Sequence, residues 1–520
     1  MIAPRGITGQ QASLGSALLM VGLVAAELGV GFAVNDPPLL LLYFAAVVGL
    51  VLVVATLLWP QTGVVTMPFL LFTQLTEVYG PRDGLVTTFQ MMIALFLVAA
   101  LSQRLLVRRE GLVLDRALVW MLLFGAAMAI SSLGAADPLL ARADLAAFLR
   151  EVLTVFVLLN LIENVRGLRL AAWTLVVAGA FLAFAALASL AGFNLGGLAV
   201  IENQYIASGE FGARISGPIG DSNEFARVLL TVLPLALYCA WDERRRVVRL
   251  AALGALGLLT VALVMTFSRG GILGLIAAAA ITILRRRIKP AQLVAFGLGL
   301  GLIVLVAPQA YWDRMNAMVQ FVSGEQTSLT ERDSSLHKRS VHLQIGALMF
   351  LEHPLIGVGK GNYKLMYPRY AARIDPAMVD RPQAAHSLPL HVAAETGVVG
   401  LIALVGLLIV ALRNLHQARR RFAAAGLTRE ALLTSAIEIA LYSYLVASLF
   451  LNYTYARYLL LLIGLAIIAR QVALRTVPLP DSPATPARPD ARPPRPTLPS
   501  AKPRRRRPGT PPGLAPIPRS

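Results

Sequence analysis

The sequence predicts an all-α membrane protein with about 12–14 transmembrane helices and one large extracytoplasmic loop. Its 520 residues are 57% hydrophobic and 14% charged, whereas a soluble domain carries about 25% charged residues. Apolar runs of about 20 residues recur, and a helix of that length crosses a hydrocarbon core of about 30 Å. The strands of a membrane barrel would instead alternate apolar and polar residues over about 10 positions. We therefore predict a polytopic helical membrane protein.

The predicted transmembrane domain covers residues 14–475 and comes after a short cytoplasmic N-terminus, residues 1–13. The first apolar run is longer than the apolar part of a usual signal peptide, so we interpret it as an uncleaved span. Three later runs are short or begin among polar residues: 63–78, 145–162 and 271–284. The full set of predicted spans is 14–34, 38–58, 63–78, 84–103, 117–134, 145–162, 170–191, 223–241, 250–267, 271–284, 291–308, 397–412, 432–449 and 456–470.

Arginine positions predict the orientation, because cytoplasmic loops carry an excess of Lys and Arg. With the N-terminus inside, the inner loops are all basic, among them Arg244-Arg245-Arg246 and Arg285-Arg286-Arg287, whereas the short outer loops are poorer in basic residues. Residues 308–397 form a basic loop too, but loops beyond about 60 residues do not follow the rule. Parity places this loop outside and both termini in the cytoplasm.

The net charge of +19 does not predict a nucleic-acid partner, because the arginines lie between apolar runs and in the tail. Residues 476–520 form a Pro/Arg-rich tail that includes Arg504-Arg505-Arg506-Arg507. Without apolar periodicity it cannot bury enough surface to fold, so we predict a disordered cytoplasmic tail. It is either simply solvated or bound to anionic lipid headgroups. The single cysteine, Cys239, can form no internal disulfide.

The segment Ser268-Arg269-Gly270-Gly271 brings an arginine between two apolar runs. The second of these runs reaches only about 20 Å as a helix, so we expect the turn to lie below the outer interface. An arginine in the membrane costs roughly 3 kcal/mol or more unless it is paired or hydrated, and such a charge usually has a function. The alternative is an interfacial arginine that snorkels outward from a tight Gly-Gly turn.

A second polar stretch, residues 212–227, lies on the predicted outer side. Asp221 is expected to cap the next helix, and Glu224 comes after it at capping-box spacing. Arg214 precedes this helix N-terminus, which itself favours anions. We hypothesise that Arg214, the helix end and Arg269 bind a pyrophosphate, because a guanidinium fork matches phosphate oxygens.

Five of the six histidines lie in the loop 308–397. His386 is the best candidate for a catalytic base, since an imidazole with a pKa of about 6.5 can take a proton from a hydroxyl; a hydrogen-bonded structural histidine is the alternative. His391 and Glu395 share one helical face, but no third ligand is spaced to complete a zinc site, so we predict no metal. The stretch Gly357-Val358-Gly359-Lys360-Gly361 lacks Walker A spacing and is interpreted as a tight turn after an amphipathic helix, 339–351.

In this order, the motifs resemble the O-antigen ligase and Wzy-type O-antigen polymerase superfamily. The pattern covers about residues 200–415 and the topology covers the whole chain. The sequence departs from the family pattern in two places: Ser387 stands where the family often has Asn, and a tryptophan is missing near His342. These departures bear on the assignment of the acceptor type more than on that of the family. The motifs are Arg214 before Gly217-Pro218-Ile219-Gly220-Asp221-Ser222-Asn223-Glu224, then Ser268-Arg269-Gly270-Gly271, Arg339, His353-Pro354-Leu355-Ile356-Gly357, His386-Ser387-Leu388 and Glu395-Thr396-Gly397.

The resemblance implies a GT-C-like glycosyltransferase of the bacterial cytoplasmic (inner) membrane that needs no metal and no cofactor. It would move a glycan from an undecaprenyl-diphosphate carrier to the hydroxyl of a glycan, glycolipid or protein, among membrane lipids at the outer face. Ligase, polymerase and protein O-oligosaccharyltransferase share this chemistry; a lipid-glycan flippase or transporter is an alternative from a different class. The implied roles are base for His386, diphosphate binding for Arg214, Arg269 and Arg339, and support for Asp221, Asn223 and Glu395.

Overall fold

The computed structural model describes a large part of the chain. The chain divides into two units, Met1–Val477 and Pro478–Ser520, and the described helices and strands lie in the first. The predicted spans 14–34 and 291–308, most of 38–58, and the tail from residue 478 apart from Gly513 lie outside the described residues. The described residues are 51, 55–56, 58–78, 88–193, 200–205, 211–285, 332–380, 385–451, 456–477 and 513.

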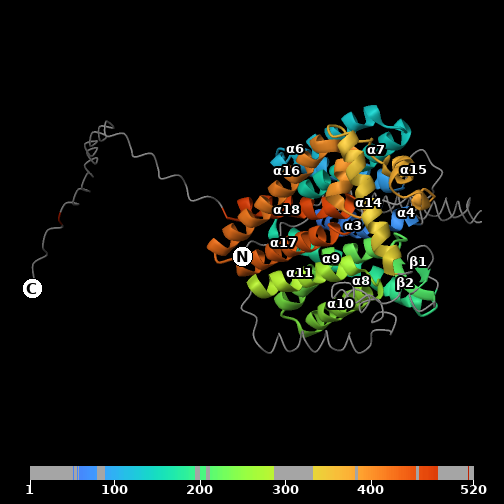
Figure 1. Cartoon of the computed structure of the whole chain (residues 1–520). Helices are drawn as coiled ribbons and strands as arrows, with labels where there is room; N and C mark the ends of the chain where they lie inside the picture. Colours follow the sequence, from blue (N-terminus) through green and yellow to red (C-terminus); the bar gives the residue numbers. More distant parts are fainter. Residues whose placement is uncertain are drawn as a thin grey trace, which may run out of the picture. The chain divides into compact units, whose positions relative to one another are not determined.

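The first unit is mainly an assembly of α-helices (Figure 1). Of those described, 8 are long and apolar enough to cross a membrane. Each contains most or all of a predicted span, although α16 extends well beyond the predicted 397–412 at both ends, and this confirms the all-α polytopic class. Apolar length is a local property of the sequence, so these elements were predictable. They are α5 (Thr88–Leu101) with the π-helix η1 (Ser102–Val107), α6 (Arg116–Ser131), α8 (Val165–Leu190), α9 (Ser222–Asp242), α10 (Arg246–Met265), α16 (Leu388–Ala424), α17 (Thr428–Ser448) and α18 (Ala456–Thr476).

The three short or polar runs also form helices, but none of them is among these 8. The run 63–78 becomes α3 (Pro60–Thr73) and α4 (Leu75–Val78), which are separated at Gln74 in the left-handed region. The run 145–162 becomes α7 (Pro138–Leu161), and the run 271–284 becomes α11 (Arg269–Arg285). The polar residues in α7 are used in packing: its buried Glu151 accepts a hydrogen bond from Arg457 Nε at 2.8 Å.

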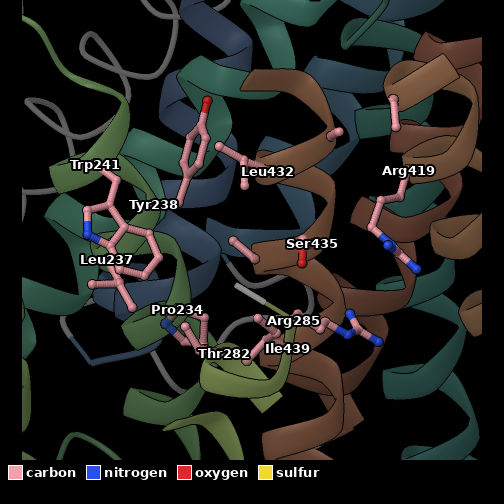
Figure 2. A pocket seen from close by; sticks show the side chains of 13 residues that line it. Pro234, Leu237, Tyr238, Trp241, Thr282, Arg285, Arg419, Leu432, Ser435 and Ile439 are labelled. Carbon is pink, nitrogen blue, oxygen red and sulfur yellow. The ribbon is translucent and has the colours of Figure 1, made fainter. Parts of the chain in front are cut away.

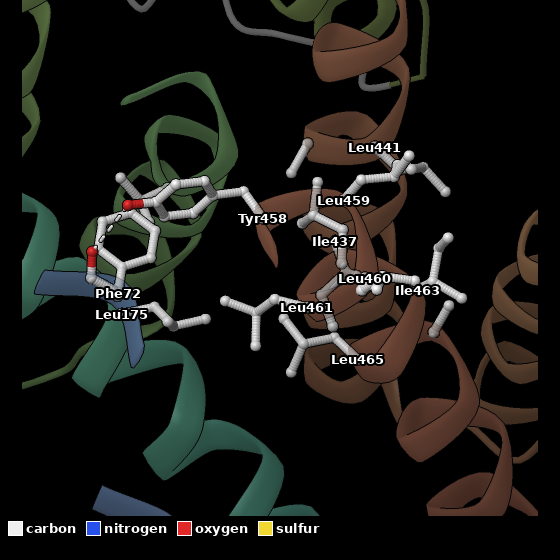
Figure 3. Close-up of a cluster of buried hydrophobic side chains, with 14 of the residues drawn as sticks. Phe72, Leu175, Ile437, Leu441, Tyr458, Leu459, Leu460, Leu461, Ile463 and Leu465 are labelled. Atoms are coloured by element: carbon white, nitrogen blue, oxygen red, sulfur yellow. Dashed lines mark hydrogen bonds between the residues drawn. The ribbon is translucent and has the colours of Figure 1, made fainter. Parts of the chain in front are cut away.

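The core is centred on α18, which is buried by α7, α8, α16 and α17. Figure 3 shows its leucines against Ile437 and Leu441 of α17 and Leu175 of α8. The Tyr458 hydroxyl donates to the carbonyl of Phe72 at 3.1 Å, so this polar atom is satisfied inside the core. A helix that is apolar on every side belongs in an interior, and in a bilayer it is close packing that stabilises such contacts.

The polar segments add smaller elements at one end of these helices. An antiparallel hairpin, β1 (Val200–Tyr205) and β2 (Phe211–Gly217), packs on α8 and α9 and was not expected from the all-helical pattern. The long loop contains α14 (Arg332–Glu352), α15 (Tyr363–Ile374) and the short 3-10 helix η4 (Pro376–Met378), of which α14 contains the predicted amphipathic helix. Tyrosines of α15 and apolar residues of α14 form a second buried cluster, which holds α14 against α15 and α16.

Candidate active site

Arg214 is held at the junction of three elements. It lies on β2 and is 3% exposed. Its Nε donates to the carbonyl of Thr266, at the C-terminus of α10, at 2.9 Å, and its Nη2 lies 3.5 Å from Oδ1 of Asn223 in the first turn of α9. The sequence predicts an irregular stretch before α9 here, whereas the hairpin fixes the guanidinium between two helix ends.

Arg269 is the first residue of α11, directly after the turn at the end of α10. The left-handed residue of this turn is Phe267, at φ 52°, and Ser268 Oγ accepts a hydrogen bond from Gly271 N at 3.2 Å. The alternative interpretation placed a tight turn at Gly270 and Gly271, but both residues are helical, and the turn lies just before them. A Cβ on Gly271 would lie 2.7 Å from the Cβ of Ala226, so glycine there permits the close approach of α11 to α9.

Arg339 lies on α14 of the long loop and interacts electrostatically with the guanidiniums of Arg214 and Arg269. Burial lowers the pKa of this α14 side chain, and the charges of Arg269 and Arg214 lower it further. Three cations from β2, α11 and α14 thus share one electrostatic neighbourhood. Within the described ranges, neither Arg269 nor Arg339 forms an ion pair with an acidic residue, so the cluster is suited to an anion with several oxygens.

His386 lies next to this cluster, immediately before α16. Its backbone is left-handed, at φ 51°, and its ring centroid is 5.2 Å from that of His342 on α14. Burial lowers the pKa of His386 to about 4, and the charges of His342, Arg339 and His391 contribute to the decrease. The imidazole is therefore neutral at physiological pH and can accept a proton. Arg339 is thus the electrostatic link between His386 and the guanidiniums of Arg214 and Arg269.

His342, which the sequence marks only by a missing tryptophan nearby, supports the site. It is 1% exposed, and the hydroxyl of Tyr367 lies 3.0 Å from its Nδ1. The hydroxyl of Tyr363 donates to the His342 carbonyl at 2.9 Å. These contacts from α15 fix the ring that faces His386. No local pattern in the sequence predicts this role, since the partners of His342 lie more than 20 residues away.

Glu395 is the centre of a buried chain of charged groups. It is 2% exposed and accepts from Lys360 Nζ at 2.6 Å, and its Oε1 lies 3.2 Å from Nε2 of His391. Lys360 also lies 3.2 Å from Asp144 of α7, while the Tyr363 ring stacks on His391 at 5.0 Å. The structure thus adds Lys360 to the predicted pair of His391 and Glu395 on one helical face. The described residues contain no group of three His, Cys, Asp or Glu that could hold a metal ion.

The glycine-rich stretch is packed against a kink in α16. Gly397 has φ 65° and ψ −166°, and a Cβ there would lie 2.2 Å from the carbonyl oxygen of Leu355. The amides of Val358 and Gly359 donate to the carbonyls of Ala394 and Glu395 at 2.9 and 3.1 Å. The glycines therefore serve a close backbone crossing, consistent with the interpretation as a tight turn, and Lys360 is held in ion pairs.

The predicted cap of α9 is confirmed: Asp221 accepts from the amides of Asn223 and Glu224 at 2.8 and 3.1 Å. The Glu224 side chain does not complete a capping box, because it forms a buried ion pair with Arg227. Arg227 also lies over the Tyr444 ring at 4.9 Å and donates to Ser448 at 3.1 Å. This contact ties the first turn of α9 to α17, and its partners are too distant in sequence to be predicted.

Residues 228–405, which include most of this site, match the family model described as O-antigen ligase. This match to about a third of the chain supports membership of the O-antigen ligase/Wzy superfamily. No curated protein matches the chain. The matched domain contains Arg269, Arg339, His386 and Glu395, whereas Arg214 lies before it. An O-antigen ligase domain implies ligase- or polymerase-type glycosyltransferase activity on lipid-linked or polysaccharide glycans, and the apolar helices make this a membrane protein.

Proposed function

We propose that the chain transfers a glycan from an undecaprenyl-diphosphate carrier to an acceptor hydroxyl at the outer face of the bacterial cytoplasmic membrane. Support comes from one observation above all: the electrostatic coupling of Arg339 to both Arg214 and Arg269 on one side and to His386 on the other. A diphosphate needs several guanidiniums and a glycosyl transfer needs a base, and the match to an O-antigen ligase domain, which includes Arg269, Arg339 and His386, supports these roles.

The proposed reaction is a direct displacement. The neutral imidazole of His386 accepts the proton of the acceptor hydroxyl, and that oxygen forms a bond to the anomeric carbon. The bond between this carbon and the phosphate oxygen breaks, and the electron pair leaves with the diphosphate. The guanidiniums of Arg214, Arg269 and Arg339 stabilise the charge that develops on the leaving group. The activated donor supplies the energy, so no nucleotide is required.

The test uses the full chain in lipid nanodiscs with an undecaprenyl-diphosphate glycan and a panel of glycan, glycolipid and peptide acceptors. We expect His386→Ala to reduce transfer by at least about 100-fold. The matched control is His353→Ala, which removes an exposed histidine from the same loop. Transfer at the normal rate by the His386 variant would refute the proposal.

The same reaction separates the related functions. One block on each acceptor indicates a ligase, and a ladder of product lengths indicates a polymerase. Transfer to the peptide alone indicates a protein O-oligosaccharyltransferase. Movement of the donor across the bilayer without a new glycosidic bond would support a flippase and contradict the transferase.

A further inference from the structure

A cavity of about 170 Å³ lies between α9, α11, α16 and α17, at the ends of these helices opposite to the candidate active site (Figure 2). Arg269 begins α11 near the active site and Arg285 ends α11 at the cavity; at 1.5 Å per residue they are ~24 Å apart along the axis. Figure 2 shows Leu237 and Trp241 of α9 across the cavity from Arg419 of α16. The cavity is therefore a second site, distinct from that of the proposed transfer.

The charged side of the cavity carries an excess positive charge. Arg285 donates to both carboxylate oxygens of Glu438 at 2.6 and 2.9 Å, and Arg419 Nε lies 3.3 Å from the same carboxylate. Arg419 Nη2 also lies 3.2 Å from Nδ1 of His416. Glu438 is 2% exposed, whereas the two arginine side chains are 27% and 31% exposed. Two accessible guanidiniums thus share one buried carboxylate, which leaves one charge uncompensated in this cluster.

A second cluster beside the cavity repeats this arrangement. Asp242, at the C-terminus of α9, lies 3.0 Å from Arg169 and 3.3 Å from Arg429. Its Oδ2 also lies 3.3 Å from the hydroxyl of Tyr238, which lines the cavity. In direct ion-pair contact, both clusters therefore have two arginines on one acid, and in the second the charge of Glu430 also acts on Arg169. Tyrosine and tryptophan are typical of the membrane–water interface, and basic pockets between helices on the cytoplasmic side bind anionic headgroups.

We propose that this cavity binds the headgroup of an anionic phospholipid, such as phosphatidylglycerol, from the leaflet that the positive-inside rule predicts to be cytoplasmic. The phosphate lies against Arg285 and Arg419, and its single negative charge compensates the excess of their cluster. The glycerol backbone and the start of a chain lie against Pro234, Leu237 and Trp241. This proposal does not depend on the proposed transferase reaction.

The experiment is native mass spectrometry of the full chain, purified in detergent and titrated with phosphatidylglycerol or with phosphatidylcholine. Arg419→Gln removes the uncompensated charge, and we expect the dissociation constant for phosphatidylglycerol to rise about five-fold, or ~1 kcal/mol for one basic residue near a lipid surface. Arg420→Gln is the matched control, because Arg420 is exposed on the same helix and does not line the cavity. We expect this control to bind like the unmodified chain.

A second variant keeps every charge and fills the space. Ser435→Leu places a larger side chain in the cavity lining, and we expect it to weaken phosphatidylglycerol binding at least as much as Arg419→Gln. Inorganic phosphate at 10 mM should not displace the lipid, since the apolar contacts also contribute. Four results would each overturn the lipid site. The first two are equal binding of phosphatidylcholine and phosphatidylglycerol, and equal losses of affinity in Arg419→Gln and Arg420→Gln. The other two are unchanged lipid binding by Ser435→Leu and displacement of the lipid by inorganic phosphate alone.

Discussion

Replacing Arg339 by glutamine should raise the pKa of His386. That pKa lies at about 4, because the imidazole is buried and because His342, Arg339 and His391 add positive charge around it; a free imidazole has a pKa of about 6.5. Burial is the largest cause and the three charges come after it. Removing one cation favours the imidazolium, so the pKa must rise, and we expect about one pH unit, or ~1.4 kcal/mol between the protonation states.

The measurement is an NMR titration of the full chain with ¹³C-labelled histidines, in which the His386→Ala spectrum identifies the resonance. This readout does not require activity, which matters because Arg339 is also a proposed diphosphate ligand. Arg369→Gln removes an exposed arginine from α15 and should leave the titration unchanged. If the pKa of His386 is the same in the Arg339→Gln protein, the two side chains are not coupled and the arrangement proposed for the site is wrong.

Three further predictions concern the support of the site. Lys360→Met leaves a buried carboxylate without its lysine and should lower the free energy of unfolding by roughly 3 kcal/mol; calorimetric melting in detergent checks this, and the exposed Lys364→Met should have no effect. Gly397→Ala should lower the melting temperature more than Gly426→Ala. Both glycines have positive φ, but only at Gly397 would a Cβ collide with the backbone of another segment. Equal melting temperatures would contradict this close backbone crossing. Asp221→Asn should retain activity, since Asn also caps a helix N-terminus, whereas Asp221→Ala should lower the free energy of unfolding by about 1 kcal/mol. An inactive Asp221→Asn variant would by itself assign the carboxylate a direct role in the reaction.

The membrane helices were predictable and most of their contacts were not. Apolar length is a property of each run, so every predicted span that falls on described residues contains a helix, although Gln74 and a few terminal residues are not helical. The packing of Gly271 on Ala226 depends on two helices meeting, and its sequence looked like that of a turn. The hairpin was missed because two short strands of mixed residues lack a clear alternation. Lys360 was assigned to a tight turn because its partners, Asp144 and Glu395, lie far away in the chain.

The choice between the two histidines at the start of α16 rests on their surroundings. His391 is 5% exposed, stacks on Tyr363 and has its Nε2 against Glu395, whose other oxygen is held by Lys360. A ring fixed in this way is suited to holding the kink in place. His386 lies outside the helix and next to the arginine cluster, where its charged form is disfavoured. A bound diphosphate would reduce that positive field and raise the basicity of His386, so the base would become effective when the donor is present.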